Sequence, residues 1–212
     1  MHHSINNLAS IQNTLKLNNA NIIAVSKTFP MSAILPLIEN KQIHFGENKV
    51  QEAVEKWTKI KQNFQNIKLH MIGKLQTNKV KFVIPLFDYI HSLDNLKLAK
   101  KISEEEQKLK KKLKIFIQVN IGNEEQKSGI RAQELSEFYK TCTYDFNLDI
   151  VGLMCLPPNE SESKKYFLEM KNLAKNLNIQ ELSMGMSNDY LDAANNGATF
   201  LRIGTKIFGN RG

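Results

Sequence analysis

Two short segments near opposite ends of the chain carry residue types that could together bind a phosphorylated aldehyde. Val25-Ser26-Lys27-Thr28 places a lysine directly after an apolar run, and Arg202-Ile203-Gly204-Thr205 places a glycine and a hydroxyl after another. A lysine amine forms a Schiff base with an aldehyde, and burial at a strand end favours the neutral amine that this reaction needs. Main-chain N–H groups at a Gly-Thr turn can bind a phosphate. Together the two segments predict a site for pyridoxal 5'-phosphate (PLP).

A parallel barrel would bring these two segments together. Eight short apolar or β-branched runs alternate with stretches of helical character, which is typical of a closed (β/α)8 TIM barrel. The predicted strands span residues 21–26, 43–46, 68–73, 88–93, 114–120, 148–155, 181–185 and 199–204. The predicted helices span residues 30–39, 48–61, 94–112, 131–141 and 161–176, and an extra helix at about residues 5–17 precedes the first strand.

The carboxyl ends of the strands hold the candidate binding residues. In this barrel the active site lies at that end, so side chains far apart in the sequence converge there. Besides Lys27 and the final turn, these positions hold Asn48 after the second strand, Lys127 in the segment after the fifth, and Met184 and Ser187 after the seventh. We therefore expect these residues to share one site.

Several of the candidates also have a purely structural interpretation. Lys27 could be a strand-end lysine that extends into solvent. Ser187 could cap the helix that follows it, and capping is compatible with phosphate binding because the same N–H groups serve both. Glu47 and Lys74 follow the second and third strands, and they could form an ion pair or contact a ligand.

The composition favours one globular domain over residues 1–212. No apolar run is long enough to span a bilayer, and the N-terminus lacks the pattern of a secretory signal, so we expect a cytoplasmic protein that is not in a membrane. Cys142 and Cys155 are the only cysteines, and neither has metal-ligand spacing. They are expected to be free thiols, and no metal site is expected.

The net charge of +8 raises the question of nucleic-acid binding. Five of the lysines, at positions 108, 110, 111, 112 and 114, end a helical segment that begins with Glu104-Glu105-Glu106, and few aromatic residues lie between them. That order complements a helix dipole and is typical of a solvated helix face. Nucleic acid is therefore not an expected partner.

Seven motifs, in order along the chain, closely resemble those of the pyridoxal phosphate homeostasis protein family. The resemblance extends from about residue 21 to residue 208. That family is similar in fold and cofactor site to the N-terminal barrel domain of alanine racemase. The motifs are Ala24-Val-Ser-Lys27-Thr, Phe45-Gly-Glu-Asn48, His70-Met-Ile-Gly-Lys-Leu-Gln-Thr-Asn-Lys79, Lys127-Ser-Gly-Ile130, Gly152-Leu-Met154, Leu182-Ser-Met-Gly-Met-Ser187 and Arg202-Ile-Gly-Thr205 with Phe208-Gly209.

The resemblance implies specific roles for five of the candidate residues. It implies a Schiff base between PLP and Lys27, and phosphate contacts from Ser187, Gly204 and Thr205. It also implies that Arg202 faces the pyridine nitrogen of the cofactor.

Three further positions are informative. Lys127 matches the place where the barrel racemases hold a cation near the cofactor phenolate. Phe29 stands where many relatives carry a second lysine, and Lys74 stands where Pro or His is common. Any role of that second lysine in relatives does not carry over to this chain.

The resemblance favours a PLP-binding protein of intracellular PLP homeostasis, with PLP-dependent apoenzymes as possible recipients. The alternative is a PLP-dependent amino-acid racemase of the alanine racemase type, and a third hypothesis is an aldolase-type lysine acting on another phosphorylated ligand. A racemase needs a second acid/base group on the opposite face of the substrate, and in the barrel racemases a domain after the barrel supplies it. The expectation is therefore a monomeric carrier without robust amino-acid turnover.

Overall fold

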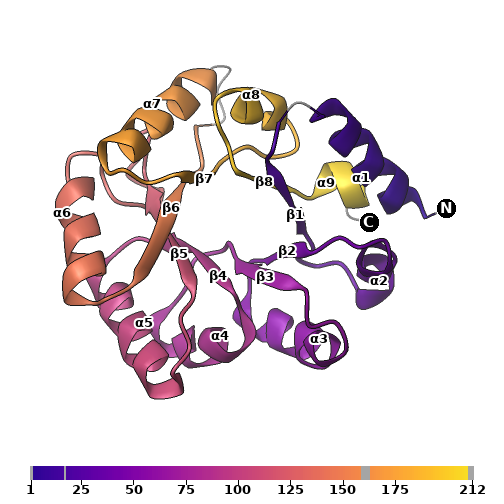
Figure 1. Cartoon of the computed structure of the whole chain (residues 1–212), viewed down its shortest axis with the longest axis horizontal. Coiled ribbons are helices and arrows are strands. Elements are labelled where there is room, and N and C mark those ends of the chain that lie inside the picture. The colour runs from indigo at the N-terminus through magenta and orange to yellow at the C-terminus, as the bar shows by residue number, and fades with distance from the viewer. Residues whose placement is uncertain (1, 17, 159–162, 210–212) are drawn as a thin grey trace.

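The computed structural model describes residues 2–16, 18–158 and 163–209. Eight strands form a closed barrel in which each strand pairs in parallel with the next and β8 pairs with β1 (Figure 1). This confirms the predicted fold class, and the observed strand ends differ from the predicted ones by one or two residues. The strands are β1 (Asn21–Val25), β2 (His44–Glu47), β3 (Lys68–Met71), β4 (Tyr89–Leu93), β5 (Lys114–Val119), β6 (Asp149–Cys155), β7 (Glu181–Ser183) and β8 (Phe200–Ile203).

Helices surround the barrel on its outer face (Figure 1). They bury apolar stripes against the sheet: α3, for example, buries Val50, Ala53 and Trp57, which are spaced at one helical face. The helices are α1 (His3–Thr14), α2 (Met31–Glu39), α3 (Val50–Asn63), α4 (Val80–Leu86), α5 (Leu96–Leu109), α6 (Leu135–Lys140), α7 (Ser163–Asn176), α8 (Tyr190–Asn195) and α9 (Thr205–Phe208). A 3-10 turn η1 (Thr77–Lys79) precedes α4, and a π-helical turn η2 (Thr141–Asp145) extends α6.

Two helices differ most from the sequence prediction. The sequence gives little sign of α4, because it has only seven residues and contains Pro85, which lacks the N–H that an interior helix position needs. The short helix α9 begins at Thr205, where the sequence predicted only a Gly-Thr turn. Both are held by packing against neighbouring helices, α4 against α3 and α5 and α9 against α1, rather than by helix propensity.

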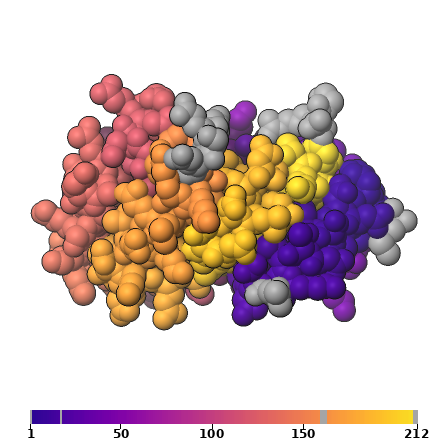
Figure 2. All heavy atoms as spheres, turned by 90° about the horizontal axis from the view of Figure 1, so that it is seen from above, coloured from indigo at the N-terminus to yellow at the C-terminus, as the bar shows by residue number. Residues whose placement is uncertain are grey.

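The first helix packs against the last one. The side-chain amide of Asn7 in α1 donates to the carbonyl of Ile207 in α9 at 3.0 Å, and the His3 ring lies 3.2 Å from the carbonyl of Phe208. In Figure 2 the indigo residues of α1 lie directly against the yellow residues of α9. The extra N-terminal helix therefore supports the turn that carries Gly204 and Thr205.

The barrel interior contains fewer aliphatic side chains than is usual for this fold. Ile23, Met154, Phe116 and Phe200 form a small apolar cluster there, with the half-buried Tyr89 packed against it. The remaining interior includes histidine rings from β2, β3 and β4. TIM-barrel interiors are usually filled by branched apolar residues, so these polar rings need an explanation.

Cys142 and Cys155 are buried free thiols, as predicted. Within the described ranges, no helix has both the length and the apolar character needed to cross a bilayer.

Candidate functional site

A cavity of about 810 Å³ opens at the carboxyl ends of the strands. Strand pairing explains why distant segments meet there: Ile23 and Ala24 of β1 lie opposite Arg202 and Ile203 of β8, so the residues that follow both strands emerge side by side. Seven of the eight predicted binding residues line this cavity: Lys27, Asn48, Lys127, Ser187, Arg202, Gly204 and Thr205.

Lys27 lies on a tight turn whose backbone is strained. The next residue, Thr28, has a φ of 67°, which is unusual for a β-branched side chain. The main-chain N–H of Thr28 donates to Glu52 at 2.5 Å, and the ammonium of Lys56 donates to the carbonyl of Ser26 at 3.0 Å. The residues on both sides of Lys27 are therefore held by two side chains of α3.

The buried side chain of Glu47 connects the Lys27 turn to α3. Its fully buried carboxylate accepts hydrogen bonds from the Ser26 hydroxyl at 2.8 Å, the Trp57 indole at 2.9 Å and Lys56 at 3.0 Å. Neither sequence interpretation of Glu47 was correct, because its ion pair is with Lys56, whereas Lys74 is exposed. The Glu47 side chain lies between β2 and α3, where Trp57 and Lys56 of α3 bond its carboxylate.

Ser187 and Thr205 bring two loops together at one side of the cavity. The hydroxyl of Thr205 donates to Ser187 Oγ at 3.0 Å, and the main-chain N–H of Lys206 points to the same oxygen at 3.3 Å. Ser187 thus caps α9 and not the helix that follows it in sequence, because the first turn before α8 is closed by Asp189. Gly185 permits this path: its φ is +89°, and a Cβ there would lie 2.4 Å from Ala193.

Arg202 is buried at the cavity floor, with 5% of its surface exposed. Its Nη1 donates to Ser183 Oγ at 2.7 Å, and its Nη2 donates to the carbonyl of Cys155 at 2.8 Å. Burial lowers the pKa of the guanidinium, and Cys155 and Asp189 oppose this shift. Since an arginine stays protonated in proteins, the cavity floor carries a fixed positive charge.

Lys127 reaches the cavity from the loop after β5. Its ammonium forms an ion pair with Glu124 at 2.5 Å and donates to the carbonyl of Pro157 at 3.2 Å. Gly129, with a φ of +127°, lets the loop fold back so closely that a Cβ would lie 2.5 Å from the Asn120 nitrogen. The partner Glu124 was not predicted.

Asn48 and Met184 differ in their relation to the cavity. Asn48 lines it, and its Oδ1 is buried without a hydrogen-bond partner among the described residues. Gly73 packs so tightly against Asn48 that a Cβ would lie 2.3 Å from the Asn48 carbonyl. Met184 is fully buried behind the cavity wall, and it is not among the lining residues.

Phe29, two residues after Lys27, also lines the cavity. Its ring stacks on Phe208 of α9 with the centroids 4.7 Å apart. The segment after Lys27 therefore contacts α9 through two stacked aromatic rings, and position 29 carries no charge.

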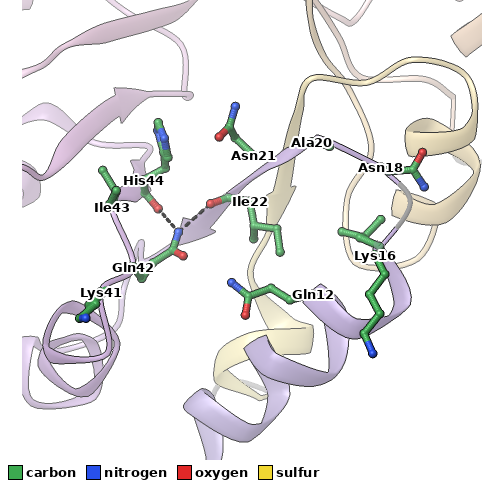
Figure 3. A pocket seen from close by; sticks show the side chains of 11 residues that line it. Gln12, Lys16, Asn18, Ala20, Asn21, Ile22, Lys41, Gln42, Ile43 and His44 are labelled. Carbon is green, nitrogen blue, oxygen red and sulfur yellow. Dashed lines mark hydrogen bonds between the residues drawn. The ribbon is translucent and has the colours of Figure 1, made fainter.

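A smaller cavity of about 360 Å³ lies at the opposite end of the barrel, beside the C-terminal end of α1 (Figure 3). Gln12, Lys16 and His44 are among its lining residues. The Gln42 amide closes its floor by donating to the carbonyls of Ile22 at 2.6 Å and His44 at 2.8 Å. It shares no residue with the large cavity.

Comparisons with known proteins agree with this geometry. A family model for the alanine racemase N-terminal domain matches residues 2–212. The pyridoxal phosphate homeostasis protein of Haemophilus influenzae is 40% identical over 210 residues, which are 94% of this chain and 86% of that protein. Its counterpart in Escherichia coli K12 is 38% identical over 199 residues, which are 90% and 85%.

Solved structures show the same architecture. PipY of Synechococcus elongatus, determined with PLP bound, has a TM-score of 0.89 and 32% identity, covering 97% of this chain and all of that one. An alanine racemase from Clostridium difficile has a TM-score of 0.76 at 18% identity, covering 99% of this chain and 57% of that one, which shows a shared fold alone.

Proposed function

The chain belongs to the pyridoxal phosphate homeostasis protein family, and from this premise we propose that it binds PLP in the large cavity and holds it on Lys27. The observation that carries the proposal is the convergence on one cavity of an amine, two hydroxyls and a buried guanidinium. Residues with purely structural roles would not need to converge on one cavity of about 810 Å³.

The residues of the cavity fit the chemical groups of PLP. Bound PLP supplies an aldehyde, and a Schiff base to Lys27 Nζ would make its retention covalent and reversible. The orphaned Oδ1 of Asn48 offers an unused acceptor inside the cavity. A buried polar atom without a partner is costly, so a donor from a ligand or a water molecule is expected there.

Ser187, Gly204 and Thr205 are the proposed phosphate group. The hydroxyl of Ser187, in the loop after β7, and that of Thr205, at the start of α9, lie 3.0 Å apart, next to the main-chain N–H of Lys206. Hydroxyl and N–H donors of this kind bind phosphate oxygens with charge-assisted hydrogen bonds. Gly204 has no side chain that could occupy the space of a phosphate. A Cβ at this position would lie 3.4 Å from Val25, in ordinary contact.

Arg202 and Lys127 are the proposed cations of the site. Arg202 is fixed at the floor by Ser183 and the Cys155 carbonyl, so it can face a ring nitrogen but cannot give that nitrogen a proton. Lys127 is held at the rim by Glu124, where a phenolate oxygen could accept from it. Met184 would act from behind the wall, through packing rather than contact.

We propose that the physiological role is to hold PLP reversibly and release it to apoenzymes, with little amino-acid turnover. Lys127 at the cavity rim is already paired with Glu124 and the Pro157 carbonyl, so it is poorly placed to serve as a second acid/base group. This pairing favours reversible binding of PLP over amino-acid turnover. The alternative is racemisation, which needs proton exchange on both faces of the substrate.

Spectroscopic titration with PLP tests the proposal. The wild-type protein is expected to develop the visible absorption band of an imine at stoichiometric PLP, and to pass PLP to an added apoenzyme. Lys27→Ala is expected to lose the band, whereas Lys74→Ala, which removes an exposed lysine, should keep it. A wild-type protein that binds no PLP would overturn the proposal.

A further inference from the structure

A continuous column of hydrogen bonds runs through the barrel interior from the floor of the large cavity. Arg202 Nη1 donates to Ser183 Oγ at 2.7 Å, and that oxygen lies 2.9 Å from His91 Nδ1. His91 Nε2 lies 2.8 Å from His70 Nδ1, and His70 Nε2 lies 2.9 Å from His44 Nδ1. The column links residues of β8, β7, β4, β3 and β2, and it ends at the partly exposed ring that borders the smaller cavity.

Counting donors and acceptors gives the column one direction. An arginine only donates, so Ser183 Oγ accepts from Arg202 and keeps its own proton for His91 Nδ1. His91 must then carry its proton on Nε2 and donate it to His70, and His70 in turn donates from Nε2 to His44. The opposite direction would leave the Ser183 hydroxyl proton without an acceptor among the described residues.

The surroundings keep the rings neutral, as this direction requires. Ser183, His70 and His91 are fully buried. Burial lowers the pKa of His70 and of His91 well below the ordinary value. Repulsion between charged forms of the neighbouring histidines lowers both pKa values further, and so does the guanidinium of Arg202 beside His91. The His70 ring stacks on Tyr89 at 4.2 Å, and the His91 ring stacks on Phe116 at 4.2 Å, which fixes both ring planes.

The column also compensates a charge that has no close counter-ion. Within the described residues no carboxylate lies within ion-pair distance of Arg202. In the direction derived above, every dipole of the column has its lone pair toward Arg202 and its N–H away from it. Aligned hydrogen bonds polarise one another in a low-dielectric interior, so their negative ends add up at the guanidinium.

We propose that Ser183, His91 and His70 are positioning residues that hold the charged guanidinium of Arg202 in a fixed orientation at the cavity floor. The contribution to PLP recognition rests on the proposed function, whereas the direction of the column does not. If the histidines only filled space, their tautomers would be unimportant and any ring of similar size would replace them.

The direction can be measured on the protein without cofactor. In 15N-labelled protein at neutral pH, nitrogen–proton correlation spectra are expected to show the neutral tautomer protonated at Nε2 for both His70 and His91. A proton on Nδ1, or a charged ring, at either residue would overturn the proposal. This result does not depend on whether the chain binds PLP.

The positioning role can be measured as a ratio of two affinities. The probes are PLP and a PLP analogue with carbon in place of the pyridine nitrogen, because only PLP offers that nitrogen to Arg202. In His91→Phe and in Ser183→Ala the preference for PLP is expected to fall about tenfold or more, the effect expected for one charge-assisted hydrogen bond. His70→Phe, which keeps the link between Ser183 and His91, is expected to give a smaller fall.

Tyr89→Phe is the matched control, because it alters a ring stacked on the column without removing any of its hydrogen bonds. It should leave the preference unchanged. Ser183→Ala changes little volume and keeps the test valid if His91→Phe does not fold. An unchanged preference in Ser183→Ala, or an equal fall in Tyr89→Phe, would overturn the positioning role. Absence of PLP binding by the wild-type protein would instead overturn the proposed function, and the tautomer result would still hold.

Discussion

The hydroxyl of Thr205 lies 3.0 Å from the hydroxyl of Ser187, although 18 residues separate them in the chain. Each follows a different barrel strand: Thr205 begins α9 directly after β8, and Ser187 lies in the loop after β7. The contact joins the two segments into one group of donors at the side of the cavity. Its chemistry suits an anionic ligand, and it supports the proposed phosphate site.

The first prediction concerns Gly204, beside these hydroxyls. Gly204→Leu is expected to weaken the binding of PLP at least about tenfold more than that of pyridoxal, since a larger side chain would displace the phosphate and its charge-assisted hydrogen bonds. Gly204→Ala is the control, because its Cβ would be in ordinary contact with Val25. Calorimetric titration with both ligands measures the difference, and equal losses for the two would argue against a phosphate site here.

A second prediction follows from the contacts that hold the Lys27 turn. Lys56→Met keeps the side-chain length but removes the hydrogen bonds to Ser26, Glu47 and Glu52. It leaves the Glu47 carboxylate buried without its cation, which typically costs about 3–5 kcal/mol of unfolding free energy. The substitution also removes a contact that holds the strained backbone beside Lys27. Imine formation with PLP is therefore expected to weaken about tenfold or more, since such strain typically amounts to about 1–3 kcal/mol.

The matched control is Lys61→Met on the same helix. It removes the ion pair with Asp88, which is 2.6 Å long and is not part of the cavity lining. Unfolding in urea and titration with PLP are measured for both variants under conditions where both are folded. A PLP affinity that falls equally in the two variants would show that Lys56 acts only through stability.

Acid is predicted to destabilise the protein through its buried histidines. Burial lowers the pKa of His44 from 6.5 to about 4, with Lys68 adding to the shift and Asp88 opposing it. Because the unfolded chain takes up the proton first, this contribution to stability is complete above pH 6.5, decreases as the pH falls below 6.5, and is lost by about pH 4. Each such histidine adds about 1.4 kcal/mol per pH unit to the slope within that window.

Urea unfolding at a series of pH values checks this dependence. His44→Asn removes one titrating ring, so its unfolding free energy should fall with a shallower slope between pH 6.5 and 4 than that of the wild-type protein. A variant with the same slope would show that His44 does not contribute.

A further prediction concerns amino-acid chemistry. The PLP-loaded protein is expected to exchange the α-proton of alanine with solvent deuterium far more slowly than an ordinary racemase. Lys127 is already paired with Glu124 and the Pro157 carbonyl, and the lack of one acid/base partner typically costs about 10²- to 10⁴-fold in rate. Mass spectrometry of alanine after incubation in deuterated water measures the exchange. Racemisation at ordinary enzyme rates would favour the racemase alternative.

Sequence reasoning found the cavity residues because the barrel rule depends only on where strands end. Lys27 and Thr205 follow clear apolar runs, so their convergence could be deduced without knowing any side-chain contact. The partner of Glu47 could not be deduced, since it depends on which face α3 turns toward β2 and on the burial of Lys56.

The histidine column could not be predicted from the sequence either. His44, His70 and His91 lie on three short strands, and which of their side chains point into the barrel depends on the register and stagger of the closed sheet. The cap formed by Ser187 was misassigned for a related reason: a hydroxyl near a helix start in sequence can lie nearer to another helix start in space.

The central claim is that Lys27 holds PLP, and reduction followed by peptide mapping tests it most directly. The protein is incubated with PLP, treated with borohydride to make the imine permanent, digested and analysed by mass spectrometry. The account predicts one modified peptide, containing Lys27, that is lost in Lys27→Ala. A stoichiometric adduct on Lys127 or Lys206 with Lys27 unmodified would contradict it.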